Sequence, residues 1–363
     1  MTYSFHQVIS RRGTDSLKYD FAERRGKPAD VLPLWVADMD FAAPQCVIDA
    51  LVEKSRHGIF GYSESREDYF KVLRSWFSSR FNWNIEPEWL IKTPGVVAAI
   101  CTAIRALTRK GDAVLIQQPV YYPFTGTVLQ NERKLSVNQL VYFRGRYTVD
   151  FEDFENKIVQ EKVRLFILCS PHNPVGRVWT REELVKLGDI CLKHGVTVVS
   201  DEIHADFTYP GHRHLVFAGV KPEFSQIAVT CTAPTKTFNL AGLQISNIFI
   251  ENPEIRRRFK QEIGKSGYSQ PNVMGITACR AAYAGGIEWL AELKEYLSGN
   301  LDFLRSFLRQ KLPQIGLVEP EGTYLVWLDF RELGLDDKKL DDLIVNRAGL
   351  WLDSGPIFGT GGE

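Results

Sequence analysis

Short apolar runs alternate with amphipathic segments through the middle of the chain, and this alternation constrains the fold more than any other feature. Apolar runs bounded by turn residues are typical of buried strands, and apolar residues at helical spacing indicate helices between them. In the clearest helix, Thr180 and Glu183 have the spacing of a capping box, and Gly195 stands where a helix often ends. The pattern predicts an α/β fold with a mostly parallel sheet flanked by helices.

Four of the apolar runs lead directly into polar or aromatic residues. These runs are 113–117, 165–169, 196–199 and 227–231. They are followed by Tyr121, Asn173, Asp201 and Lys236. Open α/β sheets bind ligands beyond the carboxyl ends of their strands, so we expect these side chains to form a single site.

Lys236 follows a buried run and a proline turn, where an ammonium group is costly to bury. Desolvation lowers the pKa of a lysine and makes its amine nucleophilic. Such an amine can form a Schiff base with an aldehyde such as pyridoxal 5′-phosphate (PLP). Taken alone, Lys236 is better explained as one of many surface cations, and it is the residues around it that favour the cofactor hypothesis.

The other strand-end residues have roles that suit PLP. Asp201 can pair with the pyridine nitrogen, and Asn173 can donate to the ring oxygen. Tyr121 can stack on the ring, a role for which its neighbour Tyr122 competes. The alternatives are a capping or loop aspartate, an Asn-Pro turn and a core aromatic residue.

The phosphate of PLP needs hydrogen-bond donors. Gly95, Val96 and Val97 begin a predicted helix, and free N–H groups at a helix start suit an anion. The hydroxyl groups of Thr232 and Thr235 flank the lysine and can add hydrogen bonds. An ordinary capped helix and solvated turn hydroxyls are the alternatives.

Composition excludes several classes of function. Formal charge balances to zero in 363 residues, which argues against a nucleic-acid partner, and no apolar run is long enough to span a membrane. The first residues do not resemble a signal peptide. Six cysteines without a Cys-x-x-Cys pair indicate a reducing, cytoplasmic location, and the histidines lack the spacing of a metal site.

The length suits a large domain with a smaller one. We assign residues 1–45 to an N-terminal arm and part of the small domain, and residues 46–284 to the large PLP-binding domain. Residues 285–363 form the rest of a small α+β domain. Within it we predict a helix over 288–312 and a strand over 321–330.

Four motifs together resemble one family. They are Trp35-Val36-Ala37-Asp38-Met39-Asp40-Phe41, Ser170-Pro171-His172-Asn173-Pro174-Val175-Gly176, Asp201-Glu202-Ile203-His204 and Thr235-Lys236-Thr237-Phe238-Asn239-Leu240-Ala241-Gly242-Leu243. The chain resembles the MalY/PatB-type cystathionine β-lyases, or C–S lyases, which are fold-type-I PLP enzymes of the aspartate aminotransferase superfamily. The first and third motifs are the more specific to this lyase branch.

The resemblance implies the cofactor roles given above, with Lys236 as the Schiff-base lysine. It also implies a homodimer with shared active sites, in which Tyr62 reaches the phosphate of the partner subunit. His204 takes a place near the ring hydroxyl. Ala37 lies in the loop that meets the substrate carboxylate, and Tyr121 and Asn173 border the substrate.

Two positions depart from the superfamily pattern. Aspartate-type aminotransferases carry an arginine eight residues after the lysine, where this chain has Gln244, so neutral donors must supply more of the phosphate binding. The sequence also stops at Glu363, short of an arginine that usually clamps the substrate carboxylate. We expect that the sequence is truncated there.

The function implied is β-elimination from cystathionine, cysteine or related S-conjugates to a thiol or sulfide, pyruvate and ammonia. An aminotransferase would use the same residues. A PLP-binding protein that regulates a transcription factor by contact is a third hypothesis. The sequence leaves the preferred thioether open.

Overall fold

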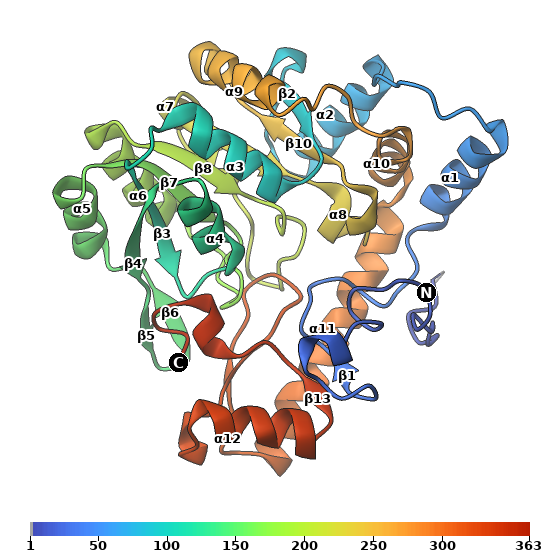
Figure 1. The fold of residues 1–363 in the computed structure, drawn as a ribbon, viewed down its shortest axis with the longest axis vertical. Coiled ribbons are helices and arrows are strands. Elements are labelled where there is room, and N and C mark those ends of the chain that lie inside the picture. Colours follow the sequence, from blue (N-terminus) through green and yellow to red (C-terminus); the bar gives the residue numbers. More distant parts are fainter. Residues whose placement is uncertain (1–2) are drawn as a thin grey trace.

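The computed structural model describes residues 3–363, and its centre is a seven-stranded sheet in the order β2-β10-β9-β8-β7-β3-β4 (Figure 1). The strands are β2 (Leu90–Thr93), β10 (Ser246–Phe249), β9 (Ala228–Thr232), β8 (Thr197–Asp201), β7 (Val163–Cys169), β3 (Ala113–Gln118) and β4 (Lys134–Gln139). Only β10 runs antiparallel to its neighbours within this sheet. The prediction of a mostly parallel sheet is confirmed.

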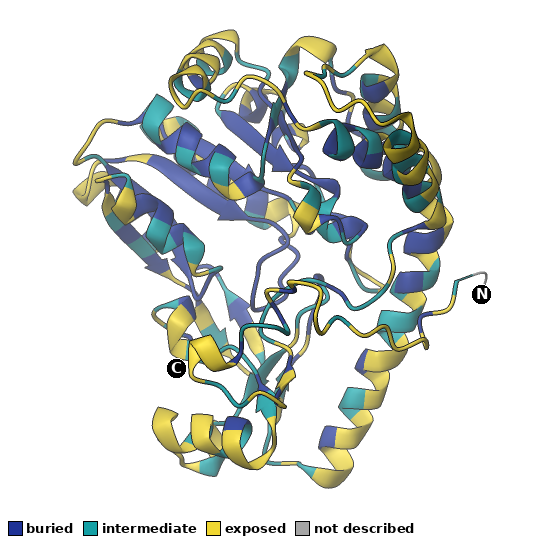
Figure 2. Cartoon of the chain, turned by 45° about the vertical axis from the view of Figure 1, so that its right-hand side comes forward, coloured by how far each residue is buried: buried dark blue, intermediate teal, exposed yellow. Residues whose placement is uncertain are grey.

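Helices cover both faces of the sheet. One face carries α3 (Val96–Leu107), α4 (Pro123–Gln130) and α9 (Pro253–Lys265). The other carries α2 (Glu67–Phe81), α5 (Phe151–Gln160), α6 (Arg181–His194), α7 (Pro222–Ser225) and α10 (Val273–Gly285). Along β7, Leu165 and Ile167 enter one core while Phe166 and Leu168 enter the other. Burial on both faces explains why these strands are apolar throughout (Figure 2).

The ends of α6 have the predicted chemistry. The Thr180 hydroxyl accepts the Glu183 N–H, and the Glu183 carboxylate accepts the Thr180 N–H. Gly195 ends the helix with φ of 64°, a left-handed conformation that glycine adopts at little cost. The helix therefore delivers β8, and with it Asp201, in a fixed register.

The N- and C-terminal parts of the chain pack together below the sheet in Figure 1. This region contains β1 (Leu32–Pro33), α11 (Ile287–Lys311), β11 (Gly316–Val318), β12 (Trp327–Asp329), α12 (Asp337–Asp341), a π-helix (Asp342–Arg347) and β13 (Leu350–Trp351). Strand β1 pairs in parallel with β13. Elsewhere lie α1 (Gln45–His57), α8 (Pro234–Thr237) and the hairpin of β5 (Val141–Phe143) and β6 (Arg146–Thr148).

The predicted strand over 321–330 is wrong in its first half, because only Trp327–Asp329 pairs as a strand. The Glu321 carboxylate is instead buried and bound by Arg177, and Thr323 takes a φ of 66°, which no strand allows. Within residues 3–363, no helix is long and apolar enough to cross a membrane.

Candidate active site

The four predicted strand-end residues come together at one edge of the sheet. Strands β9, β8, β7 and β3 are adjacent and parallel, so their carboxyl ends lie side by side. Tyr121, Asn173 and Lys236 line a cavity of about 1510 Å³ between this edge and the C-terminal segments. Asp201 lies just outside the cavity wall, at the buried end of β8.

Lys236 sits on the single turn of α8, at the end of the buried strand β9. Its Nζ donates to the carbonyl oxygen of Ala37. Burial lowers the pKa of Lys236, although the carboxylates of Asp38 and Asp201 partly restore it. The lysine therefore has the depressed basicity that a nucleophilic amine requires.

The Asp201 carboxyl group is 5% exposed, and burial raises its pKa to about 7. Among the described residues, the one hydrogen bond to this carboxyl group comes from the N–H of Ile203, at 3.1 Å. In residues 3–363 no cation forms an ion pair with it. A buried carboxyl group without a cation is costly, and a protonated ring nitrogen would supply the missing charge.

Two of the predicted site residues have a buried polar atom without a partner among the described residues. These atoms are Oδ1 of Asn173 and Nδ1 of His204. Burial lowers the pKa of His204 to about 3, with the Lys236 charge adding to the effect, so the imidazole is neutral. Since buried polar groups are nearly always bonded, these atoms indicate that a polar molecule belongs here.

Tyr121 is held over the site by its own backbone, whose N–H donates to the carbonyl oxygen of Asn173 at 2.9 Å. Burial raises the pKa of its phenol to about 12, and Tyr122 and Asp201 add to the rise. Tyr122 contacts the Phe358 ring at 5.7 Å between centroids. Both tyrosines line the cavity, and the choice between them as the stacking ring stays a prediction.

Of the expected phosphate donors, some have free protons and one does not. Val96 and Val97 are the first residues of α3 and Gly95 precedes them, so their N–H groups have no helical acceptor. Thr235 is half-buried beside the lysine. The Thr232 hydroxyl instead donates to the carbonyl oxygen of Asn247 on β10, at 2.8 Å, and thereby offers no free proton to a phosphate.

Hydrogen bonds from several side chains hold the loop that contains Ala37. The Tyr324 hydroxyl donates to the Ala37 carbonyl oxygen at 3.0 Å, beside the bond from Lys236. Asn239, three residues after the lysine, accepts the N–H of Met39 and donates to the carbonyl oxygens of Met39 and Phe41. No pattern in the sequence marked Tyr324 or Asn239 as a site residue.

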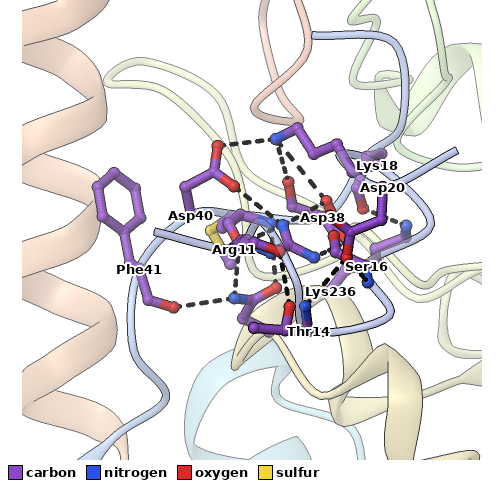
Figure 3. Close-up of polar contacts among 12 residues, drawn as sticks. Arg11, Thr14, Ser16, Lys18, Asp20, Asp38, Asp40, Phe41 and Lys236 are labelled. Carbon is purple, nitrogen blue, oxygen red and sulfur yellow. Dashed lines mark hydrogen bonds and ion pairs between the residues drawn. The ribbon is translucent and has the colours of Figure 1, made fainter. Parts of the chain in front are cut away.

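Two cations of the N-terminal segment hold the same loop, as Figure 3 shows. The Arg11 guanidinium binds both oxygens of Asp38, at 3.0 and 2.7 Å, and reaches Asp40 at 2.9 Å. Lys18 is buried and binds the Asp40 carboxylate at 2.8 Å. We call these four residues the N-terminal clamp, and sequence reasoning did not find its cations.

Tyr62 lies apart from the residues above in this single chain. It stands in the connection between α1 and α2 and is 99% exposed, next to exposed Ile59 and Phe60. Its expected contact with a partner subunit stays a prediction.

The arrangement fits PLP on the chemistry of its own groups. A lysine with lowered pKa suits the aldehyde, and the unpaired Asp201 carboxyl group suits the ring nitrogen. The orphan Nδ1 of His204 suits a polar ring substituent, and the free N–H groups of α3 suit the phosphate.

The mixed sheet and a lysine at its carboxyl edge define the class of fold-type-I PLP enzymes. A family model described as aminotransferase class I and II matches residues 29–363, and the chain belongs to that family. The predicted resemblance is confirmed by relatives that match over nearly the whole chain.

Cystathionine beta-lyase PatB of Bacillus subtilis (strain 168) is 43% identical over 360 residues, which cover 99% of this chain and 93% of that protein. Protein MalY of Escherichia coli (strain K12) is 32% identical over 364 residues, 99% of this chain and 92% of MalY. The structure of the PLP-bound C–S lyase from Staphylococcus hominis superposes with a TM-score of 0.92 at 32% identity, covering 99% of this chain and 92% of that one.

Proposed function

We propose that the chain is a PLP-dependent C–S lyase that carries out β-elimination on cysteine thioethers, with cystathionine as a substrate. One thioether and one water give one thiol, one pyruvate and one ammonia. The observation that carries this proposal is the identity of 43% to a cystathionine beta-lyase over 99% of the chain. The lowered pKa of Lys236 and the buried carboxyl group of Asp201 support it, because a nucleophilic amine and a partner for the ring nitrogen are what a PLP enzyme needs.

Seven residues would hold the cofactor. Lys236 would bind its aldehyde carbon, Asp201 its ring nitrogen, Asn173 its ring oxygen and Tyr121 its face, while the N–H groups at residues 95–97 would bind the phosphate. When bound, PLP supplies an electron sink for the carbanion that forms at the substrate's Cα.

The chain's own residues then move protons. Lys236 Nζ takes the Cα proton as general base, a task that its lowered pKa favours because more of the amine is then unprotonated. The same amine protonates the leaving sulfur. The Ala37 carbonyl oxygen accepts a hydrogen bond from Lys236 Nζ and another from the Tyr324 hydroxyl, and these two bonds fix the loop beside the amine.

The test is elimination without an amino acceptor. Purified protein with added PLP is given L-cystathionine and no keto acid, and thiol and pyruvate are measured together. Equal amounts of both are expected, and the Lys236→Ala variant is expected to produce neither. Failure of the wild type to release thiol, with glutamate formed once 2-oxoglutarate is supplied, would instead establish an aminotransferase.

We also infer a cytoplasmic homodimer in which Tyr62 of one subunit completes the site of the other. The exposed apolar side chains of Ile59 and Phe60 beside Tyr62 support an interface there. The six free cysteines support a reducing compartment. A mass of about twice the chain's 41.3 kDa in light scattering is expected, and a monomer at working concentration would contradict the dimer.

A further inference from the structure

Two cysteines, Cys169 and Cys231, lie level with Asp201 on the strands to either side of it. In the register of the sheet, Asp201 on β8 is paired with Cys169 on β7 and with Cys231 on β9. Side chains of register partners point to the same face of a sheet, and both cysteines belong to the core that Val199 enters, two residues before Asp201. The Asp201 carboxyl group therefore lies between two thiols.

All three side chains are buried. Cys169 is 4% exposed, Asp201 5% and Cys231 0%. The next residue in this row of the sheet is Ile248 on β10, the register partner of Cys231. The neighbours of Asp201 in the row are thus two thiols and an alkyl group, none of which is a strong hydrogen-bond donor.

Among the described residues, neither thiol donates a hydrogen bond to the carboxyl group. Cys169 Sγ accepts the N–H of Asn173 at 3.4 Å and donates to a backbone carbonyl oxygen at 3.5 Å. The one contact of Cys231 Sγ within residues 3–363 is with the carbonyl oxygen of Val229 on its own strand, at 4.0 Å. The Asp201 charge nevertheless acts on both thiols, because burial raises the pKa of each and this charge raises it further.

The chemistry of these neighbours matters because of what a hydroxyl group would do in their place. Serine has nearly the shape of cysteine, but its hydroxyl is a strong hydrogen-bond donor, whereas a thiol is a weak one. A hydroxyl bonded to the carboxylate would favour the charged form and lower the pKa of Asp201. A carboxylate stabilised in this way would gain less from a protonated ring nitrogen.

We propose that Cys169 and Cys231 are positioning residues, which fill the space on both sides of Asp201 without binding its carboxyl group and so keep that group for the ring nitrogen of the cofactor. The inference rests on the proposed PLP-dependent function, in which Asp201 pairs with this nitrogen. Binding of the cofactor then relieves the cost of burying the carboxyl group, and part of the affinity for PLP comes from that relief. Neither thiol takes part in proton transfer.

The test compares serine with alanine at position 231, where the thiol has the fewer contacts. Cys231→Ser adds a donor, and Cys231→Ala removes the thiol without adding one. The control is Cys191→Ser in α6, because Cys191 is also 0% exposed, and burial without any effect of Asp201 raises its pKa. Two quantities are measured: the Kd of PLP, and the free energy of unfolding of the cofactor-free protein at pH 5 and pH 8.

We expect Cys231→Ser to raise the Kd of PLP about tenfold, as the loss of one hydrogen bond to a charged group would, and Cys231→Ala to raise it less than twofold. Cys191→Ser is expected to leave the Kd unchanged.

The cofactor-free protein reports on the carboxyl group without any catalysis. A raised pKa of Asp201 makes the wild type lose stability as pH rises, so a serine that lowers this pKa makes the variant gain stability relative to the wild type between pH 5 and pH 8. Lys236, Glu202 and Tyr121, whose charges also interact with Asp201, are the same in every variant. The control is expected to shift the free energy of unfolding equally at both pH values.

A serine variant with the Kd of the alanine variant overturns the role of the thiols while leaving the lyase function intact. So does a stability difference from the wild type that is equal at pH 5 and pH 8. If Cys231→Ser does not fold, an infrared titration of the cofactor-free wild type against Asp201→Asn decides, because a carboxyl group that titrates near its ordinary 3.8 is already stabilised by the protein and overturns the inference. A wild type that binds no PLP refutes the proposed function and the inference with it.

Discussion

Replacement of Asp201 by asparagine is expected to stabilise the cofactor-free protein while it removes the catalytic activity. The carboxyl group is buried without an ion pair among residues 3–363, and its pKa in the folded chain is about 7, compared with 3.8 as its ordinary value, although the Lys236 charge acts to lower it. An amide of the same shape has no charge to desolvate. Its oxygen can still accept the Ile203 N–H that Asp201 accepts at 3.1 Å.

The sign of the pH dependence follows from this raised pKa. As pH rises from about 4 to about 7, the unfolded chain has released this proton and the folded chain still holds it, so the wild type loses stability across that window. The rise of about three pKa units lowers the wild type's free energy of unfolding by about 4 kcal/mol at pH 8, since one unit is worth about 1.4 kcal/mol. At pH 5 the raised pKa of Asp201 lowers the wild type's free energy of unfolding by about 2 kcal/mol.

Denaturant unfolding of both cofactor-free proteins at pH 5 and pH 8 measures the effect. The variant's advantage in unfolding free energy is expected to grow by about 2 kcal/mol between the two values. Asp206→Asn serves as a control that is expected to destabilise the protein, because it weakens the contacts that Asp206 makes with Arg80 at 2.7 Å and with the Thr237 hydroxyl at 2.9 Å. An advantage that is equal at both pH values, or a wild type that is the more stable at pH 8, would refute the reasoning.

Two further substitutions test the clamp and the core. Arg11→Gln removes the Arg11 ion pairs to both aspartates of the clamp and leaves Asp38 only the longer ion pair to Lys18 at 3.7 Å. We therefore expect a fall in kcat and an upward shift of the pH profile that reports Lys236, because the Asp38 carboxylate raises the pKa of that lysine; an unchanged profile contradicts this. Gly188→Ala places a Cβ 2.2 Å from the Phe224 ring, which is expected to cost about 1–3 kcal/mol in thermal unfolding. Gly299→Ala, in the open and exposed part of α11, is the matched control and is expected to gain about 0.5–1 kcal/mol; equal effects of the two would contradict the packing argument.

The parts of the fold that the sequence predicts correctly depend on local signals. The capping box of Thr180 and Glu183 and the glycine after α6 are fixed within one segment, and the structure has both. The ends of the apolar runs can also be read from neighbouring residues, and for this reason Tyr121, Asn173 and Lys236 could be expected at one edge of the sheet. Parallel pairing of adjacent strands is enough to bring them together.

The parts that the sequence did not reveal depend on distant pairs. The run from Glu321 alternates like a strand, but its first carboxylate is taken by Arg177, which lies 144 positions earlier. Arg11 and Lys18 reach the loop at 38–40 without any periodic pattern that marks them as partners. Charges of this kind pair through the fold, and a single sequence shows only that they exist.

The chemistry of Lys236 depends on several parts of the chain at once. The end of β9 buries the amine and lowers its pKa, while Asp201 on the neighbouring strand and Asp38 in the N-terminal loop act against that shift. Arg11 holds Asp38 in place, so a residue near the start of the chain helps to set the basicity of a lysine more than two hundred positions away. The sequence identifies each of these carboxylates through a motif, but only their positions around one amine determine whether burial or charge prevails, and in this structure burial does.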